Sequence, residues 1–298
     1  MKKLLLMVPV LLASASASAG LVSAAGGVSW NTLPSEPNFA AAVEYTQWWS
    51  TTNTTGIADH NVALDGASIA PTIASLATAI ANGDSPELVG VGQVLLGGGL
   101  GEPNCGNCEL TFSFGGLYFD GIQTVGTGAF APDGNGGFVE IMADVPVINS
   151  QDSWLNIYID YQANEFDEGA VVDEASANSE GAEAVDGTLW LSAQNELFEY
   201  TPDGSSGAEP LSVGSSSFVS NIIGGIAQFN IESNFFQNMY DVDAFGLTSS
   251  FVKSDGTIAN YSDRGTGNFA AQTVSEPGTM ALFGLGLLGL AGVARRKA

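Results

Sequence analysis

Short runs in which apolar and polar residues alternate dominate the chain from about residue 89 onward. The clearest runs are residues 110–114, 137–142, 154–160, 187–192, 227–232 and 245–251. Clusters of Gly, Asn, Asp or Ser bound these runs, which is typical of β-strands joined by turns. Alternation gives each strand one dry face and one wet face. The pattern therefore predicts a mainly β body, an antiparallel β-sandwich or jelly-roll-like fold.

The segment before these strands has a different pattern. Residues 37–45 and 67–80 are rich in alanine, which predicts short helices, and the Gly-Asp-Ser-Pro sequence at 83–86 would end the second one. We interpret residues 30–85 as a small N-terminal α-containing segment packed on the sheets. The Gly-rich stretch 91–101 lacks the spacing and the lysine of a nucleotide-binding loop, and it predicts a strand followed by a turn.

The N-terminal residues have the three parts of a secretory signal peptide. Lys2 and Lys3 precede the apolar run 4–12, and the small residues Ala17-Ser18-Ala19 follow it. We expect residues 1–19 to direct export through the Sec machinery and to be removed by signal peptidase. Residues 20–273 would then form a secreted, acidic, β-rich domain.

The charge of that domain is strongly negative. The whole chain has a formal net charge of −25, but the span from residue 20 to 273 holds 31 acidic residues and only Lys253 and Arg264, which gives −29. Such a field repels nucleic acid and anionic membranes and favours cations. A saline habitat and a calcium-containing matrix would both suit this composition.

Two short acidic patterns are candidate calcium sites. Asp133 and Asn135 lie in a Gly-rich turn, and Asp241 and Asp243 flank one residue beside an expected strand. Calcium takes six to eight oxygen ligands, so each pair is a fragment of a site, and a solvated turn is the alternative. We expect no other cofactor. The acidic stretch 164–187 contains no basic residue, and we interpret it as a long exposed loop.

Cys105 and Cys108 are the only two cysteines and form a CxxC pattern directly before an expected strand. A redox pair and half a zinc site are the alternatives that such spacing raises. There is no second CxxC, and His60 is the only histidine, so a tetrahedral zinc site lacks ligands. In an exported chain, the pattern favours a short disulfide that pins a turn.

Catalytic motifs are scarce. The chain contains no G-x-S-x-G, P-loop or HExxH sequence, and His60 is the only candidate for a histidine base. A pair of catalytic carboxylates like that of a glycosidase remains an alternative, because the 31 acidic residues offer many pairs. We therefore expect the body not to be an enzyme.

The C-terminal residues have the order of a signal that stops an exported chain in the membrane, with an apolar run before basic residues. Sixteen uncharged residues, 279–294, precede Arg295, Arg296 and Lys297. An α-helix of that length spans about 24 Å, which is short for a bilayer. The basic end would remain cytoplasmic by the positive-inside preference. We expect residues 274–298 to contain a transmembrane helix that holds the chain in the inner membrane only transiently.

This ending resembles the PEP-CTERM sorting signal of Gram-negative bacteria, in which a Pro-Glu-Pro-type motif precedes an apolar helix and an Arg-rich end. Glu276, Pro277 and Gly278 stand at the motif, while Ser275 replaces the usual first proline. The resemblance implies processing by an exosortase, a membrane-embedded cysteine transpeptidase or protease. It also implies release or transfer to the cell surface or the exopolysaccharide matrix.

Parts of the body, residues 108–116, 154–160 and 187–191, resemble PEP-CTERM proteins associated with flocculation. This resemblance implies a structural or adhesive role in biofilm or floc formation, with exopolysaccharide as a partner and no nucleic acid. The alternative is an extracellular carbohydrate-binding protein or carbohydrate-active enzyme. Trp48 and Trp49 form, with Tyr45, an aromatic group that suits either a sugar platform or a core.

Overall fold

The computed structural model describes residues 21–31, 38–51, 72–97, 99–162, 166–202, 213–232, 245–253 and 262–273. The described helices are η1 (Ala25–Gly27), α1 (Ile73–Ala81), η3 (Glu168–Ala170) and α2 (Glu174–Glu183). The main sheet closes into a ring, which is described below. The strands outside this ring are β1 (Leu21–Ser23), β2 (Ser29–Asn31), β6 (Phe138–Asn149) and β10 (Ile231–Glu232). The ring strands are β3 (Asn38–Ser50), β4 (Glu87–Val94), β5 (Glu109–Pro132), β7 (Trp154–Asp160), β8 (Thr188–Pro202), β9 (Val213–Gly224), β11 (Phe245–Lys253) and β12 (Asp263–Thr273).

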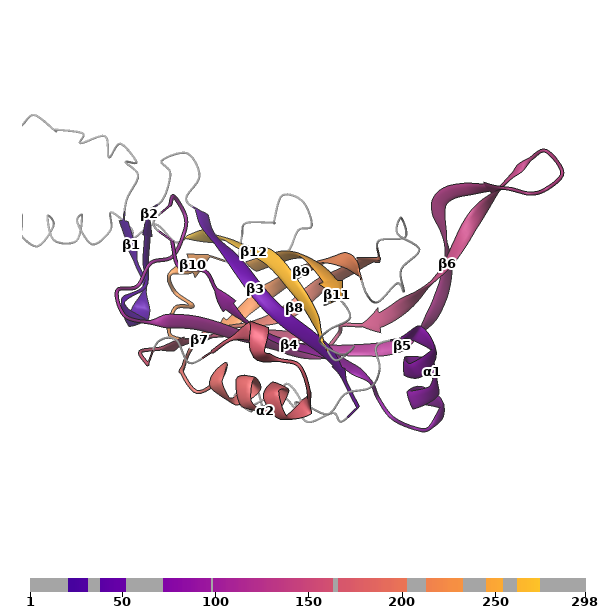
Figure 1. Cartoon of the computed structure of the whole chain (residues 1–298). Helices are drawn as coiled ribbons and strands as arrows, with labels where there is room; N and C mark the ends of the chain where they lie inside the picture. The colour runs from indigo at the N-terminus through magenta and orange to yellow at the C-terminus, as the bar shows by residue number, and fades with distance from the viewer. Residues whose placement is uncertain are drawn as a thin grey trace, which may run out of the picture.

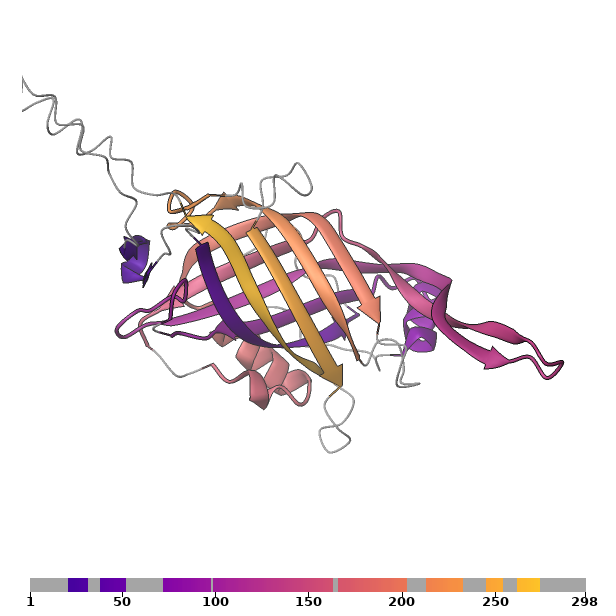
Figure 2. The same cartoon turned by 90° about the horizontal axis from the view of Figure 1, so that it is seen from above.

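The main sheet closes on itself. It runs in the order β3, β4, β5, β7, β8, β9, β11 and β12, and β12 then pairs with β3, as Gly265 opposite Tyr45 illustrates. All these pairings are antiparallel. Figure 2 shows β3, β12, β11 and β9 side by side on one wall of the ring. The prediction of a mainly β, antiparallel body is therefore confirmed, and one closed sheet provides the opposing walls.

The inside of the ring is filled by large side chains. Among the fully buried ones are Phe39, Phe112, Trp190, Phe245 and Phe269, which come from five different strands. Phe112 and Phe269 meet edge to face, with ring centroids 5.1 Å apart. Such packing makes the interior a hydrophobic core rather than a channel.

Glycines in the strands make room for these rings. Gly92 lies directly opposite Phe112, Gly265 opposite Tyr45 and Gly214 opposite Phe251. A Cβ atom on Gly92 or Gly265 would overlap the aromatic ring of its partner. The ring fills the space above the glycine, which compensates for the side chain that the glycine lacks. These pairs explain why glycine recurs within strands, where it normally weakens a sheet.

A second layer covers part of the outer wall. Trp48, Val89 and Trp154 point outward from the ring and pack beneath the segment that carries η3 and α2. Ala177 and Ala184 complete this smaller core. Figure 1 shows α2 lying along the ring below β4 and β7. The prediction of a long exposed loop across residues 164–187 is thus wrong for its described part, 166–187.

Two local features explain why this acidic stretch folds. Asp173 caps α2, because its carboxylate accepts the backbone N–H of Ser176 at 2.9 Å. In turn, the Ser176 hydroxyl oxygen accepts the backbone N–H of Asp173 at 3.0 Å. The small residues Ala177 and Gly181 face the ring and let the helix approach it closely. An acidic composition alone was therefore a poor guide to exposure.

The helix predicted for residues 37–45 is also wrong, because these residues enter β3. Phe39, Ala41 and Val43 are buried and face the core, while Ala40 and Ala42 are exposed. Pairing of Ala40, Ala41 and Ala42 with β12, continued by pairing with β4 from Val43 onward, overrides the helix preference of alanine. The second predicted helix is present as α1, which begins after Thr72 because the Thr72 hydroxyl oxygen accepts the Ser75 N–H at 3.0 Å.

The predicted strand 227–232 is reduced to its last two residues, β10. Gly225 has a positive φ of 95°, and the chain then turns through residues 226–230. The Ala227 N–H donates to the carbonyl oxygen of Trp190 at 2.9 Å, which holds this turn against β8. The other alternating runs named above fall within or overlap β5, β6, β7, β8 and β11.

The longest strand leaves the ring and forms a projecting hairpin. Beyond Tyr118, β5 pairs only with β6 among the described strands. Figures 1 and 2 show this hairpin extending past α1, away from the end of the body where β1 lies and β12 ends. We call residues 120–149 the arm.

Candidate functional site

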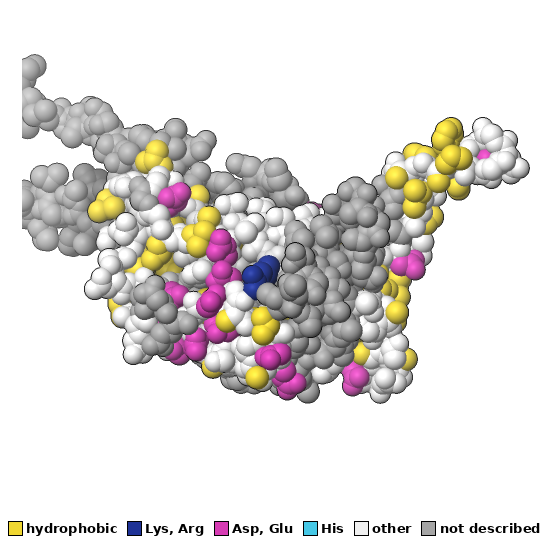
Figure 3. All heavy atoms as spheres, in the orientation of Figure 1, with side chains coloured by type: hydrophobic (Ala, Val, Ile, Leu, Met, Phe, Trp, Pro, Cys, Tyr) yellow, Lys and Arg dark blue, Asp and Glu magenta, His cyan; other side chains and the backbone are white. Residues whose placement is uncertain are grey.

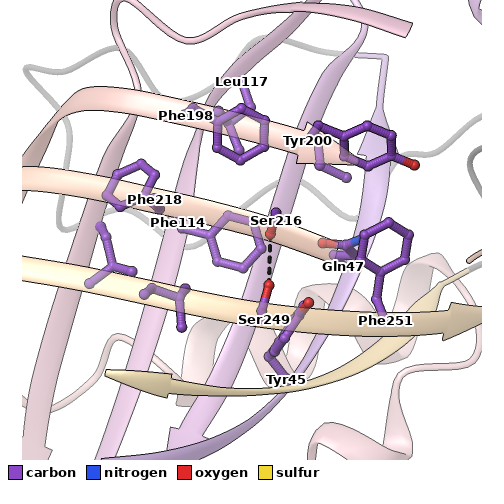
Figure 4. A pocket seen from close by; sticks show the side chains of 13 residues that line it. Tyr45, Gln47, Phe114, Leu117, Phe198, Tyr200, Ser216, Phe218, Ser249 and Phe251 are labelled. Atoms are coloured by element: carbon purple, nitrogen blue, oxygen red, sulfur yellow. Dashed lines mark hydrogen bonds between the residues drawn. The ribbon is translucent and has the colours of Figure 1, made fainter. Parts of the chain in front are cut away.

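A small cavity lies inside the ring and is lined by described residues. Its volume is about 20 Å³, and Tyr45, Gln47, Tyr200, Ser216 and Ser249 supply its polar groups. Figure 4 shows Ser216 and Ser249 facing each other among phenylalanine rings, and their hydroxyl oxygens are 2.7 Å apart. A space of this size holds about one water molecule, so this cavity has no room for an organic ligand.

Burial keeps the phenols of this cavity protonated. Desolvation raises the pKa of Tyr45 to about 12, the Ser249 hydroxyl opposes that shift, and the negative charge of Asp263 adds to it. Burial also raises the pKa of Tyr200, with Asp263 and Tyr45 as smaller causes. The Tyr200 ring stacks on Phe251 at 5.6 Å. Both phenols therefore stay neutral near neutral pH and do not act there as acids or bases.

A buried carboxyl group lies elsewhere in the body, at the start of β4. Glu87 is only 1% exposed, and its Oε1 accepts the Gly116 N–H at 2.5 Å. Within the described residues, Oε2 has no hydrogen-bond partner. Desolvation raises the pKa of Glu87 to about 7, and the hydrogen bond from Gly116 opposes part of that shift. Glu87 is sealed from solvent, so it has no access to a substrate.

The outer wall of the ring carries an acidic groove with a volume of about 320 Å³. Its lining includes Glu44, Glu168, Ser250, Arg264 and Thr266. Glu44 comes from β3, Glu168 from η3 and Arg264 from β12, so the ring and its outer layer build the groove together. Figure 3 shows acidic side chains gathered around a basic one on this face. We call it the acidic groove.

The charges in the acidic groove are close enough to influence one another. Burial raises the pKa of Glu168, and the nearby carboxylates of Glu44 and Asp167 raise it further. Gln93 Nε2 donates to Glu168 Oε2 at 2.7 Å. Arg264 Nη2 donates to the backbone carbonyl of Gly169, which fixes the position of η3 against β12. The groove is lined by two acidic residues and one basic residue, so acidic side chains outnumber the guanidinium.

A second shallow depression adjoins the groove. It has a volume of about 520 Å³, shares Glu44, and is lined by the small polar side chains of Thr248, Ser250, Thr266 and Asn268. Thr248 lies opposite Asn268, and Ser250 opposite Thr266, on the neighbouring strands β11 and β12. Carboxylates and hydroxyls thus form one continuous polar surface outside the ring.

Only one of the two candidate calcium pairs lies among the described residues. Asp133 and Asn135 lie in the turn between β5 and β6, where Asp133 Oδ1 accepts the N–H groups of Asn135 and Gly137, both at 2.8 Å. These hydrogen bonds lower the pKa of Asp133. Asp241 and Asp243 lie outside the described residues. Within the described ranges no three His, Cys, Asp or Glu side chains gather as a metal site would require.

The two cysteines are joined. Cys105 and Cys108 form a disulfide with their Cα atoms 5.6 Å apart, directly before β5. Cys108 is buried at the edge of the core, so the bridge ties the entry of the longest strand to the ring. A short disulfide at this place agrees with the predicted structural role of the pair.

The remaining predicted features lie outside the described residues. They are the signal peptide 1–19, His60, the motif residues Glu276, Pro277 and Gly278, and the basic residues Arg295, Arg296 and Lys297. The described helices are all too short or too polar to traverse a bilayer. The apolar run 279–294 lies outside the described residues.

Sequence reasoning did not single out Glu44, Glu87 or Glu168. Glu44 follows Val43, and Glu87 precedes Leu88. A charged residue next to an apolar run is the one local signal that marks these two positions. Arg264 was noticed as one of two basic residues in the body, but nothing nearby in the chain indicates its contact with η3.

Comparison with known proteins assigns the C-terminal end. Residues 273–297 match the family described as the PEP-CTERM protein-sorting motif. No curated protein and no solved structure matches the chain. The motif implies export, sorting to the cell surface and processing by an exosortase. The resemblance noted for residues 274–298 is thus confirmed, and the chain is a PEP-CTERM domain-containing protein.

Proposed function

We propose that the exported body is a structural and adhesive component of a biofilm or floc, in which divalent cations bridge its carboxylates to acidic exopolysaccharide. Calcium is the cation we favour, because carboxylate and carbonyl oxygens are its preferred ligands. The proposal includes no catalytic role for the body and no nucleic-acid partner.

The acidic groove is the observation that carries this proposal. The Glu44 carboxylate lies close enough to Glu168 to contribute to its raised pKa, and the depression beside them offers hydroxyl and amide groups. A divalent cation relieves such repulsion, and polar side chains suit the hydroxyl groups of a sugar chain. The interior supports the same reading, because its cavity of about 20 Å³ cannot take a sugar.

Millimolar Ca²⁺ at fixed ionic strength should raise the melting temperature and should be required for co-aggregation with an acidic polysaccharide. Binding to the folded form alone stabilises it by mass action. Differential scanning fluorimetry and turbidity measure the two effects. Replacing Glu44 and Glu168 by glutamine should reduce both, while Glu199→Gln, which changes an exposed carboxylate on β8, should reduce neither.

Sodium at equal ionic strength is the essential control, because plain screening helps with any salt. An identical shift with sodium would contradict the cation-bridging proposal and favour adaptation to a saline habitat. Asp133→Ala and Asp241→Ala then separate the groove from the two candidate calcium pairs. A loss of the calcium effect in those variants would place the ion at one of these pairs instead.

An extracellular carbohydrate-binding or carbohydrate-active role is the second candidate. The juxtaposed carboxyl groups of Glu44 and Glu168 favour it, because a raised pKa on one of two acids is the arrangement used for acid–base cleavage of glycosidic bonds. Release of reducing ends from a polysaccharide, lost in Glu168→Gln, would establish this role in place of the structural one.

We further propose that the chain passes through the inner membrane of a Gram-negative bacterium and loses both ends there. Signal peptidase would remove residues 1–19, and the exosortase would remove the basic end. Intact-mass measurement of protein extracted from the cell surface should therefore give a mass without Arg295, Arg296 and Lys297. A mass that retains these residues would favour a permanent membrane anchor.

A further inference from the structure

The two segments that direct the chain to a membrane attach at the same end of the body. Leu21, the first described residue, follows the expected signal peptide 1–19, and β12 ends at Thr273, where the matched sorting motif begins. Figures 1 and 2 show β1 and the end of β12 at one end of the ring, with the arm beyond the other end. We call the surface made by residues 21–31, 94–97, 99–108 and 221–231 at this end the terminal face.

Hydrogen bonds join the segments of the terminal face to one another. The Ala25 N–H donates to Asn230 Oδ1 at 3.4 Å, which links η1 to the turn after β9. The Gly101 N–H donates to the carbonyl oxygen of Asn31 at 2.7 Å, and the Ala40 N–H donates to the carbonyl oxygen of Gly101 at 2.9 Å. These bonds hold β2, the loop after β4 and the start of β3 together. Segments that are far apart in the sequence therefore form one surface.

Large apolar side chains are exposed on each segment of this surface. Leu21 is 68% exposed, Leu100 57% and Phe229 81%. Phe229 is more exposed than any other large apolar side chain among the described residues, and Ile226 beside it in the same turn is exposed as well. Several exposed apolar side chains gathered on one surface mark a contact with a protein or a membrane.

The terminal face is also poor in charge. Residues 20–273 hold 31 acidic residues, yet the segments of the terminal face hold only Glu102 and no basic residue. The Glu102 carboxylate accepts the Gly99 N–H at 2.8 Å. The arm, in contrast, carries four acidic residues, which are Asp120, Asp133, Glu140 and Asp144. A negative body is repelled by a negatively charged surface, and the terminal face is where this repulsion is weakest.

The length of chain beyond β12 limits how far the terminal face can lie from a membrane. Only six residues separate Thr273 from Thr279, where the apolar run 279–294 begins, and six residues span at most about 22 Å. The arm leaves the ring near the other end of β12, roughly 35 Å along that strand from Thr273. When the apolar run lies in a bilayer, the terminal face is therefore the part of the body closest to the lipid.

We propose that the terminal face rests on the surface of a phospholipid bilayer while the chain is held there by residues 274–298. Leu21, Leu100 and Phe229 would enter the boundary between headgroups and acyl chains, as the apolar side of a peripheral protein does. The partner is a zwitterionic lipid surface, because the body repels an anionic one. This inference rests on the proposed passage through the inner membrane. The contact would keep Glu276 and Pro277 beside the bilayer, where a membrane-embedded exosortase acts.

Quenching of tryptophan by brominated lipid tests the contact in the full chain, reconstituted through its C-terminal end into phosphatidylcholine vesicles. Phe229→Trp places an exposed indole on the terminal face, and Phe138→Trp, at a residue 73% exposed on the arm, is the matched control. The emission that Phe229→Trp adds to that of the wild type should be lost in brominated vesicles. The emission added by Phe138→Trp should be kept, and equal or stronger quenching of that variant would overturn the proposal.

A second pair of variants separates lipid contact from simple tethering. Leu100→Glu, added to Phe229→Trp, puts a carboxylate on the terminal face and should restore emission in brominated vesicles. Val139→Glu, on the arm, changes a residue of nearly equal exposure, 56% against 57%, and should not restore it. Quenching that Leu100→Glu leaves unchanged would mean that the tail alone brings this end to the lipid, which would overturn the contact. Each variant changes an exposed residue, so unchanged melting temperatures confirm folding.

Flotation of the vesicles distinguishes a failure of this contact from a failure of the proposed membrane passage. A full chain that does not float with the vesicles would overturn both the passage and the contact that rests on it. A chain that floats while Phe229→Trp keeps its emission would overturn the contact alone. Calcium and polysaccharide are absent from these vesicles, so neither result bears on the cation-bridging role.

Discussion

Replacing Gly265 by alanine should lower the free energy of unfolding by about 3 kcal/mol, at the upper end of the cost of overpacking. Gly265 on β12 lies opposite Tyr45 on β3, at the pairing that closes the ring. A Cβ atom at this position would overlap the Tyr45 ring, and its three nearest atoms all belong to that ring. Tyr45 is only 2% exposed. Urea unfolding followed by tryptophan fluorescence measures the effect.

A double-mutant cycle identifies the cause. In the Tyr45→Ala background the methyl group of alanine 265 has space, so the two substitutions together should cost at least about 1.5 kcal/mol less than the sum of their separate costs. Thr266→Ala changes the exposed neighbour on the same strand and should stay within about 0.5 kcal/mol of the wild type. Additive costs at Tyr45 and Gly265 would mean that the ring overlap is not the source of the destabilisation.

The second large effect depends on pH. Glu87 has a pKa raised to about 7 in the folded protein, whereas an unperturbed glutamate has a value near 4.5. Between these two values the folded state binds a proton that the unfolded state has lost. This group therefore makes stability fall as pH rises from about 4.5 to about 7, and its effect is constant above that range. The total change is about 3 kcal/mol.

Glu87→Gln removes the ionisation while keeping an oxygen that can accept the Gly116 N–H. At pH 8 we expect this variant to be more stable than the wild type by up to about 3 kcal/mol, and at pH 4 to be nearly equal to it. Chemical denaturation at both pH values is the measurement. Other carboxylates shift the absolute curve of both proteins, so the difference between the two is the quantity to compare. A difference that does not change with pH would show that Glu87 stays ionised in the folded state or is solvated.

Local patterns were sufficient wherever the structure depends on neighbours in the chain. Alternation at residues 110–114 and 154–160 correctly placed strands in β5 and β7, because side chains that point alternately into the ring and toward its outer face leave a period of two in the sequence. The order of motif, apolar run and basic end in residues 274–298 was enough to predict the sorting signal that the family match confirms. Both signals are contained in a few consecutive residues.

Tertiary structure decided the features that join distant segments. Residues 37–45 have a helical composition, yet they are a strand because β12, more than 200 residues later, pairs with them and closes the ring. The acidic helix α2 is ordered because its alanines meet Trp48 and Trp154 across the outer wall. Neither contact leaves a local pattern.

The acidic groove and the arm show the same division. Single carboxylates such as Glu44 and Glu168 are visible in the sequence, but only the packing of η3 against β3 and β12 brings them together and shifts a pKa. The alternation in residues 137–142 predicted a strand, whereas the departure of β6 from the ring left residues 138–142 exposed on both faces. Period and composition record which residues are apolar, and the pairing of strands determines what those residues meet. Free energy depends on the contacts made, so burial, charge coupling and exposed surface were decided by the closed sheet.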